Sequence, residues 1–114
     1  MSDKPTDMSR IELIDPATAR TWIEAGAAIV VDVRETHEFT TAHIEGATLV
    51  PLSIFDPAAV PPHDDKKLLL VCASGVRCGM AAEQLAAAGF MEMYRLEGGL
   101  MAWYENGGPL VSGT

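Results

Sequence analysis

Apolar positions in this chain form short runs separated by polar turns, a pattern that indicates buried strands. Residues 28–31 are continuously apolar, and residues 67–71 are apolar after their first position. Such unbroken runs are typical of strands covered on both faces of a parallel sheet. Shorter strands are predicted at residues 10–14, 47–50 and 93–96.

Three amphipathic stretches lie between or after these runs and predict helices. The first covers residues 16–25, where Asp15 has the side chain of an N-cap and Pro16 suits the first helical position. Residues 78–88 and 100–106 form the other two, and a glycine follows each of the three helices. Strands that alternate with helices in this way predict an α/β fold with a mainly parallel sheet.

Two segments are predicted as loops with little regular structure. Residues 34–43 suit a loop with a turn or two of helix, and residues 57–62 a loop with one helical turn. Residues 1–8 are polar and lack periodicity, so we expect a disordered tail there and one domain over residues 9–112.

Composition excludes several classes of function. The net charge of −8, without a Lys/Arg cluster, argues against nucleic-acid binding, which depends on neutralising phosphates. No apolar run approaches the roughly 20 residues that span a bilayer, and no apolar signal segment is visible, so we expect a cytoplasmic protein without a membrane partner. Three dispersed histidines and two cysteines have no metal-ligand spacing, so neither metal nor cofactor is expected.

The chemically informative position is Cys72, where the apolar strand 67–71 meets the following helix. Backbone N–H groups of a glycine-containing loop and of a helix N-terminus carry partial positive charge, and Arg77 adds a full one. Together they favour thiolate over thiol. The loop that would hold this sulfur consists of Ala73, Ser74, Gly75, Val76, Arg77 and Cys78. The alternative is that Cys72 is one more small buried side chain.

Three stretches of the chain resemble the single-domain rhodaneses. They are Val31-Asp32-Val33-Arg34 with Glu38-Phe39 and His43-Ile44-Glu45-Gly46-Ala47, then Cys72-Ala73-Ser74-Gly75-Val76-Arg77, and Leu96-Glu97-Gly98-Gly99-Leu100-Met101-Ala102-Trp103. The resemblance covers about residues 10–110 and implies a five-stranded, mainly parallel sheet with helices on both faces. It also implies a sulfurtransferase that carries sulfane sulfur as a persulfide on Cys72. The implied partners are a small anionic donor such as thiosulfate, a thiol or cyanide acceptor, or a protein persulfide.

The remaining candidate residues are expected to support this site. Arg77 would clamp the anionic donor through charge-assisted hydrogen bonds. We expect Arg34 to pair with Glu38, Asp32 to fasten the strand end near the loop, and His43 to be a hydrogen-bonded structural residue.

Cys78 departs from the family pattern, which usually has a small hydroxyl residue after the arginine. One interpretation is simple replacement, because cysteine is nearly isosteric with serine. The other is a resolving cysteine that attacks a persulfidated or oxidised Cys72. A disulfide needs Cα atoms within about 7 Å, so geometry decides whether the second interpretation is feasible.

Two further functions compete with sulfur transfer. Phosphatases and arsenate reductases of related fold also use a Cys-loop-Arg site, but their loop has one residue more than the four that separate Cys72 from Arg77. Non-catalytic rhodanese-like modules for binding or regulation typically lack the loop cysteine, which this chain retains.

Overall fold

A computed structural model describes residues 9–113 of the chain. Its elements, in chain order, are β1 (Arg10–Ile14), α1 (Pro16–Glu24), β2 (Ala28–Asp32), α2 (Thr36–Thr41), β3 (Thr48–Leu49), the 3₁₀ turns η2 (Leu52–Ile54) and η3 (Pro57–Ala59), β4 (Lys67–Val71), α3 (Val76–Ala87), β5 (Glu92–Leu96) and α4 (Gly99–Glu105). The tail expected at residues 1–8 lies outside the described residues. Over residues 9–113, no helix combines the length and the apolar character that crossing a membrane requires.

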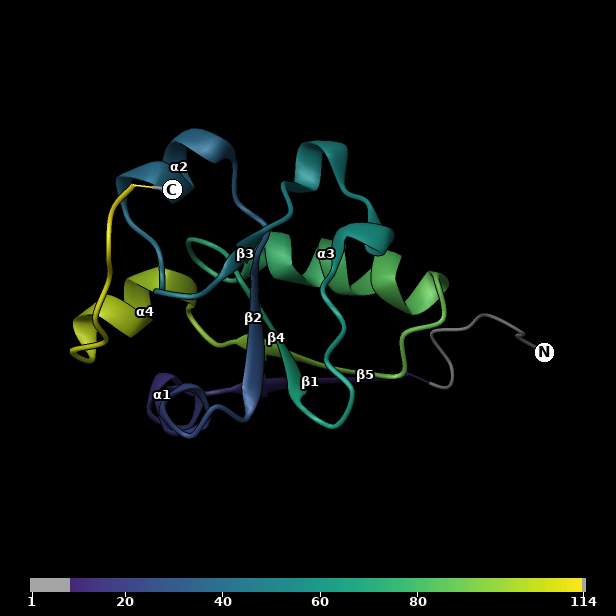
Figure 1. Cartoon of the computed structure of the whole chain (residues 1–114), viewed down its shortest axis with the longest axis horizontal. Helices are drawn as coiled ribbons and strands as arrows, with labels where there is room; N and C mark the ends of the chain where they lie inside the picture. Colours follow the sequence, from purple (N-terminus) through teal and green to yellow (C-terminus); the bar gives the residue numbers. More distant parts are fainter. Residues whose placement is uncertain (1–8, 114) are drawn as a thin grey trace.

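The five strands form one sheet in the order β1-β5-β4-β2-β3, and all four strand pairs are parallel (Figure 1). The predicted α/β fold with a five-stranded, mainly parallel sheet is therefore confirmed. β4 lies at the centre, and its last four residues are buried. Asp32 at the end of β2 is in register with Val71, the last residue of β4. These two strands therefore deliver Cys72 and the segment after Asp32 to the same edge of the sheet.

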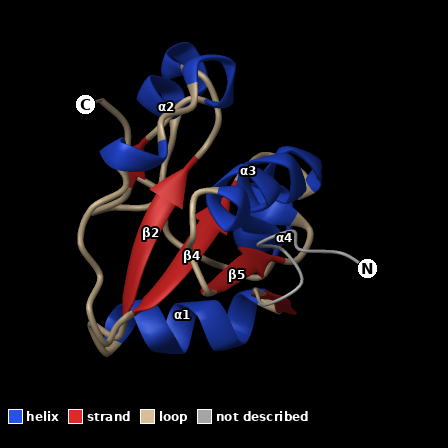
Figure 2. Ribbon diagram, turned by 90° about the vertical axis from the view of Figure 1, so that its right-hand side faces the viewer, coloured by secondary structure: helices blue, strands red, loops and turns tan. Residues whose placement is uncertain are grey.

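Helices cover both faces of the sheet, as predicted. Leu68 and Leu70 pack with the buried side of α3, whereas Leu69 and Val71 pack with residues of α1 and α4. This alternation follows from the two-residue period of a strand. Figure 2 shows α1 on one face of the sheet and α3 on the other. Trp103 of α4 is almost completely buried and packs in the core on the α1 face of the sheet, together with Leu69 and Val71.

Helix α3 begins at Val76, two residues before the start at residue 78 that the sequence pattern predicts. Gly75, the N-cap residue of α3, has a φ of 103°, a left-handed conformation that glycine adopts at little cost. This sharp turn lets the helix start at Val76 directly after the loop. Arg77 and Cys78 are consequently part of the first turn of α3.

The carboxyl ends of the strands carry the loop segments that build the site. Cys72 directly follows β4, and α2 lies beyond the end of β2 (Figure 2). The start of α4 also reaches this edge, because Leu100 N–H donates to the carbonyl of Cys72 at 2.8 Å. In open α/β sheets this is the edge at which ligands bind.

Candidate active site

The sulfur of Cys72 lies inside the turn that joins β4 to α3. The N–H groups of Gly75 and Cys78 point at its Sγ, with N···S distances of 3.1 Å and 3.4 Å. Both cysteines are fully buried and neither is in a disulfide. Donors preorganised around one sulfur stabilise its anionic form, because they need no rearrangement when charge develops there.

The surroundings lower the pKa of Cys72 from its ordinary value of 9.0 to about 6. The largest cause is a hydrogen bond from the Cys78 side chain. Burial opposes the shift, and the N–H groups of Cys78, Gly75 and Arg77 add to it. These contacts therefore favour the thiolate form of Cys72. The same contact and burial raise the pKa of Cys78 far above its usual range, so Cys78 stays a thiol.

The Gly98-Gly99 pair holds the loop from the side of α4. Gly99 has a φ of 65°, and a Cβ at this position would collide with the carbonyl oxygen of Ala73. Met101 N–H also donates to the carbonyl of Ala73 at 3.1 Å. The sequence pattern includes both glycines but does not reveal this role, which is to let two backbone segments approach closely.

Arg77 makes a different contact from the one predicted. Its Nη1 and Nη2 donate to the two carboxylate oxygens of Glu38 in α2, at 2.8 Å and 2.9 Å. This hydrogen bond lowers the pKa of Glu38 from 4.5 to about 2 and raises that of Arg77. Glu38 thus occupies the fork of the Arg77 guanidinium group, and the binding of an anionic donor by Arg77 stays a prediction.

The prediction that Arg34 pairs with Glu38 is wrong, because Glu38 pairs with Arg77. Arg34 instead binds Asp32, with 2.8 Å between Nη2 and Oδ2, and donates to the carbonyl of Ala42 at 2.6 Å. Asp32 is fully buried, and the Arg34 guanidinium group donates to both of its carboxylate oxygens. The two residues are only two positions apart in the sequence, so the contact is local. The pair fixes the segment that follows β2.

His43 has the surroundings of a structural histidine. Its Nδ1 lies 2.7 Å from the carbonyl oxygen of Phe39, and the two rings stack at 3.8 Å. Its backbone pairs with Val111 and so ties the chain end to α2. His43 therefore supports the helix that carries Glu38.

The loop residues around Cys72 differ in exposure. Ser74 and Val76 are exposed, Ala73 is half-buried, and Gly75 is buried against the start of α4. The structure thus brings together all the residues predicted for the loop. It adds Arg95 of β5, which the sequence motifs do not single out and whose Nη2 donates to the carbonyl of Gly75 at 3.0 Å.

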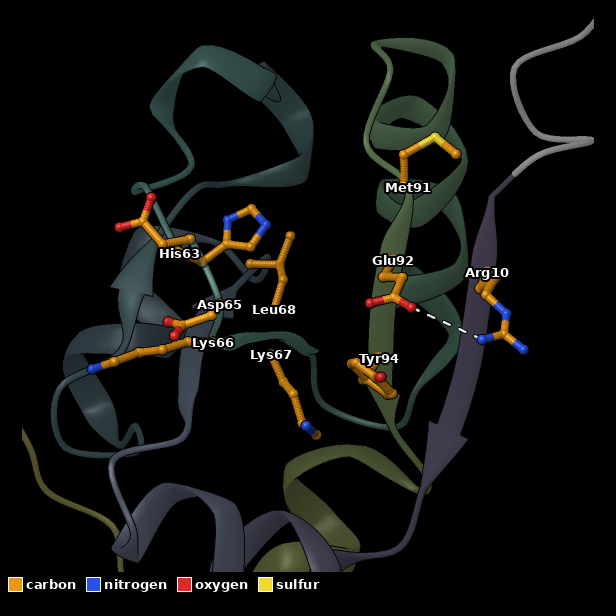
Figure 3. A pocket seen from close by; sticks show the side chains of 10 residues that line it. Arg10, His63, Asp65, Lys66, Lys67, Leu68, Met91, Glu92 and Tyr94 are labelled. Carbon is orange, nitrogen blue, oxygen red and sulfur yellow. Dashed lines mark ion pairs between the residues drawn. The ribbon is translucent and has the colours of Figure 1, made fainter.

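A hollow of about 460 Å³ lies at the opposite edge of the sheet (Figure 3). The residues that line it include Arg10, Lys67 and Glu92, which are the first residues of β1, β4 and β5. Its lining therefore carries charges of both signs. It holds neither cysteine. Across the described part of the chain, no three His, Cys, Asp or Glu side chains gather closely enough to bind a metal ion.

The fold and site define an α/β protein with a buried cysteine in a loop of inward-pointing N–H groups, at the carboxyl end of its central parallel strand. Residues 15–106 match the sequence profile of the family described as "Rhodanese-like domain". The chain belongs to this family.

Individual relatives agree with this assignment. The chain is 42% identical over 98 residues to the Synechocystis protein slr1261, a match that covers 86% of this chain and 55% of the relative. It is 32% identical over 108 residues to the probable adenylyltransferase/sulfurtransferase MoeZ of Mycobacterium tuberculosis, covering 90% of this chain and 27% of MoeZ. This chain therefore spans only part of these relatives, about half of the first and a quarter of the second.

A solved structure of similar size shows the same fold. The rhodanese-related protein of Thermoplasma volcanium superimposes with a TM-score of 0.75 and 32% identity, over 88% of this chain and 97% of that one.

Proposed function

We propose that this protein is a sulfurtransferase that carries sulfane sulfur on Cys72. The observation that carries the proposal is a buried sulfur with two backbone N–H groups aimed at it and a pKa lowered to about 6. A thiolate is soft and nucleophilic, which suits attack on a second sulfur atom.

The first half-reaction loads the enzyme. The Cys72 thiolate attacks the terminal sulfur of a donor such as thiosulfate and forms a new S–S bond. The S–S bond of the donor breaks, and its electron pair leaves with sulfite. The persulfide keeps one negative charge, which the loop N–H groups stabilise as they do the thiolate.

The second half-reaction unloads it. Cyanide or a thiolate attacks the outer sulfur, the persulfide S–S bond breaks, and Cys72 leaves as a thiolate. With cyanide the product is thiocyanate. No redox cofactor takes part, and free thiols suit a reducing compartment such as the cytoplasm.

The comparison with MoeZ supports this reaction class, since that relative is named a sulfurtransferase. The matched part is only 27% of MoeZ, so the adenylyltransferase half of its name does not transfer to this chain. The buried sulfur favours donors that present a single exposed sulfur atom at the loop.

The competing functions make different demands on the same loop. A phosphatase must surround a tetrahedral phosphoryl group. The four residues between Cys72 and Arg77 make a short loop for that purpose, and the Arg77 guanidinium group is already paired with Glu38. A purely binding module has no use for a lowered thiol pKa. Hydrolysis of p-nitrophenyl phosphate by the wild type, without sulfur transfer, would favour the phosphatase.

The proposal is tested by intact-protein mass spectrometry before and after thiosulfate. We expect one added sulfur atom on the wild type, removed by cyanide with release of thiocyanate. Cys72→Ser should gain no sulfur, because an alcohol neither ionises here nor holds a sulfane sulfur. If Cys72→Ser keeps more than about a tenth of the thiosulfate:cyanide rate, the assignment of Cys72 is wrong.

A further inference from the structure

An arginine on the central part of the sheet lies directly under the Cys72 loop. Arg95 is the fourth residue of β5, and its backbone is in register with Leu70, two residues before Cys72. Met93, two positions earlier in β5, belongs to the core beneath α3, so strand alternation directs Arg95 to the same face. An arginine therefore occupies a position at which its neighbours on this face are apolar.

The helix above provides room for the guanidinium group. Gly79 of α3 has no side chain, and a Cβ built there would lie 3.2 Å from Nη2 and 3.4 Å from Cζ of Arg95. Nη2 then donates to the carbonyl oxygen of Gly75 at 3.0 Å. Gly79 and Gly75, four residues apart in sequence, thus frame one guanidinium group.

This contact fixes the orientation of a peptide group in the loop. A trans peptide is planar, so its C=O and N–H point in opposite directions. Because Arg95 holds the Gly75 carbonyl, the N–H of Val76 points away from Arg95. The peptide cannot flip without breaking this hydrogen bond, and the Gly75 N–H contact to the Cys72 sulfur depends on the same left-handed turn.

Arg95 also differs from the other cations of the site in its charge balance. Arg34 is paired with Asp32, and Arg77 with Glu38. Within residues 9–113, no carboxylate lies within ion-pair distance of Arg95, and its buried Nε has no hydrogen-bond partner. The charge of Arg95 reaches the Cys78 sulfur, the side-chain partner of Cys72, because it acts to lower the pKa of Cys78.

We propose that Arg95 is a positioning residue of the Cys72 site, which holds the Gly75–Val76 peptide and supplies the uncompensated positive charge beneath the loop. Arg77 has the expected position in the sequence, but its charge is balanced by Glu38. The persulfide part of this role rests on the proposed function. The effect on the Cys72 thiolate does not.

The test measures the pH dependence of Cys72 alkylation by iodoacetamide, with the site of modification mapped by mass spectrometry. Arg95→Met removes the charge and the hydrogen bond, so the alkylation pKa should rise by about half a unit to one unit. Arg95→Lys keeps the charge, so its alkylation pKa should lie closer to that of the wild type than to that of Arg95→Met. Its thiosulfate:cyanide turnover should stay at least about threefold reduced, because an ammonium group lacks the guanidinium geometry.

Gly79→Ala provides a variant that leaves Arg95 in the chain. Its new Cβ crowds the guanidinium group, while alanine itself favours the helix. We expect the alkylation pKa of Cys72 to rise by less than in Arg95→Met, without loss of thermal stability. This combination would not arise if Arg95 served only to stabilise the fold.

Arg10→Met is the matched control. Arg10 begins β1 at the opposite edge of the sheet, where it makes an exposed 3.9 Å ion pair with Glu92 (Figure 3). Its removal should leave the Cys72 pKa unchanged. If Arg95→Met and Gly79→Ala are folded by circular dichroism and both titrate like the wild type, the proposal is overturned. If Arg95→Met does not fold, Gly79→Ala and Arg95→Lys decide the matter by the same readouts.

The outcomes separate this role from the proposed function. A wild type that transfers no sulfur, with a raised alkylation pKa in Arg95→Met, would refute sulfur transfer and support the role of Arg95. Normal sulfur transfer with an unchanged pKa in Arg95→Met would do the reverse.

Discussion

At the scale of single residues, the behaviour of Cys72 depends on the groups within hydrogen-bond reach of its sulfur. The Cys78 thiol and three backbone N–H groups outweigh the burial that would otherwise keep the sulfur protonated. The N–H of Cys78 is 3.4 Å from the Cys72 sulfur, so covalent geometry limits the Cα–Cα separation to at most about 8 Å. This limit lies close to the range that a disulfide needs.

We predict that Cys78→Ser keeps thiosulfate:cyanide sulfur transfer within about twofold of the wild type. A hydroxyl group has nearly the same volume as a thiol at this position and donates a hydrogen bond to the same sulfur, so the Cys72 thiolate is retained. The melting temperature should be nearly unchanged. Steady-state kinetics and a thermal melt check both expectations.

The competing interpretation of Cys78 has its own signature. Peroxide would convert Cys72 to a sulfenic acid, and the Cys78 thiol would displace water to form a disulfide. Peptide mapping after mild peroxide detects the linked peptide, and Cys78→Ser would instead over-oxidise at Cys72. A Cys72–Cys78 disulfide as the dominant product would show that Cys78 is a resolving cysteine.

At the scale of secondary-structure elements, the site is held by contacts between segments that are far apart in sequence. Glu38 of α2 and Arg77 of α3 are 39 residues apart, and their bidentate pair ties the two helices across the loop mouth. The start of α4 closes the other side through Gly99. The loop conformation is therefore a property of three helices and one strand end together.

The Glu38–Arg77 pair should couple stability to pH. The pKa of Glu38 is about 2 in the folded protein and 4.5 ordinarily, so its stabilisation is present above pH 4.5 and is lost as pH falls towards 2. Glu38→Gln should lower the free energy of unfolding at pH 7 by on the order of 1–2 kcal/mol, with little effect near pH 2. Urea denaturation at both pH values measures this difference.

A double-mutant cycle with Arg77→Met shows whether the pair is the cause. The loss in the double variant should be smaller than the sum of the two single losses, because each single change already removes the same contact. Strictly additive losses would mean that Glu38 and Arg77 stabilise the protein through other groups. Arg20→Met, which breaks the exposed pair with Glu24, should cost less than about 1 kcal/mol.

Gly99→Ala should disrupt the site more than its size suggests. A Cβ at Gly99 meets the Ala73 carbonyl, and alanine is also strained at a φ of 65°. We expect a loss of unfolding free energy above about 2 kcal/mol and a clear rise in the alkylation pKa of Cys72. Gly26→Ala is the control, since Gly26 has a φ of 69° and a Cβ added there would meet nothing within 4 Å. Equal effects of the two changes would leave backbone strain alone as the explanation.

At the scale of the whole molecule, the net charge opposes the local charge of the site. The chain carries a net charge of −8, whereas Arg95 beneath the loop has no carboxylate within ion-pair distance among residues 9–113. If the proposed function holds, a dianionic donor such as thiosulfate meets repulsion from this net charge at long range. The global field therefore gives no electrostatic steering towards this site.

We predict that kcat/KM for thiosulfate rises about twofold between 10 and 150 mM salt at pH 8. Salt screens the long-range repulsion, because the Debye length falls from about 30 Å to about 8 Å over this range. Alkylation of Cys72 by neutral iodoacetamide at the same pH should change little, and it serves as the control. A fall of kcat/KM with salt would mean that local cations dominate the approach of the donor.

Several features of this protein follow from the sequence alone. The apolar runs predict the strands, because a strand that is buried on both faces of a sheet has apolar side chains at successive positions. Cys72 directly follows the run at residues 67–71, which predicts a site at the edge of the sheet where the strands have their carboxyl ends. Asp15, Pro16 and the helix-ending glycines act through their own neighbours, so their effects are local. Arg95 carries a readable signal as well, since it shares a strand face with Met93.

The charge pairs and the loop conformation were decided by the tertiary structure. Three acidic residues, Asp32, Glu35 and Glu38, lie within four positions of Arg34 in the sequence. Only the fold directs the Arg34 side chain to Asp32 and leaves Glu38 for Arg77. Likewise, Gly99 contacts Ala73 and Arg95 contacts Gly75 only because parallel strands bring their following segments to one edge. Backbone propensity and hydrophobic periodicity act over a few residues, whereas charge pairing depends on distances across the folded chain, which a linear sequence does not specify.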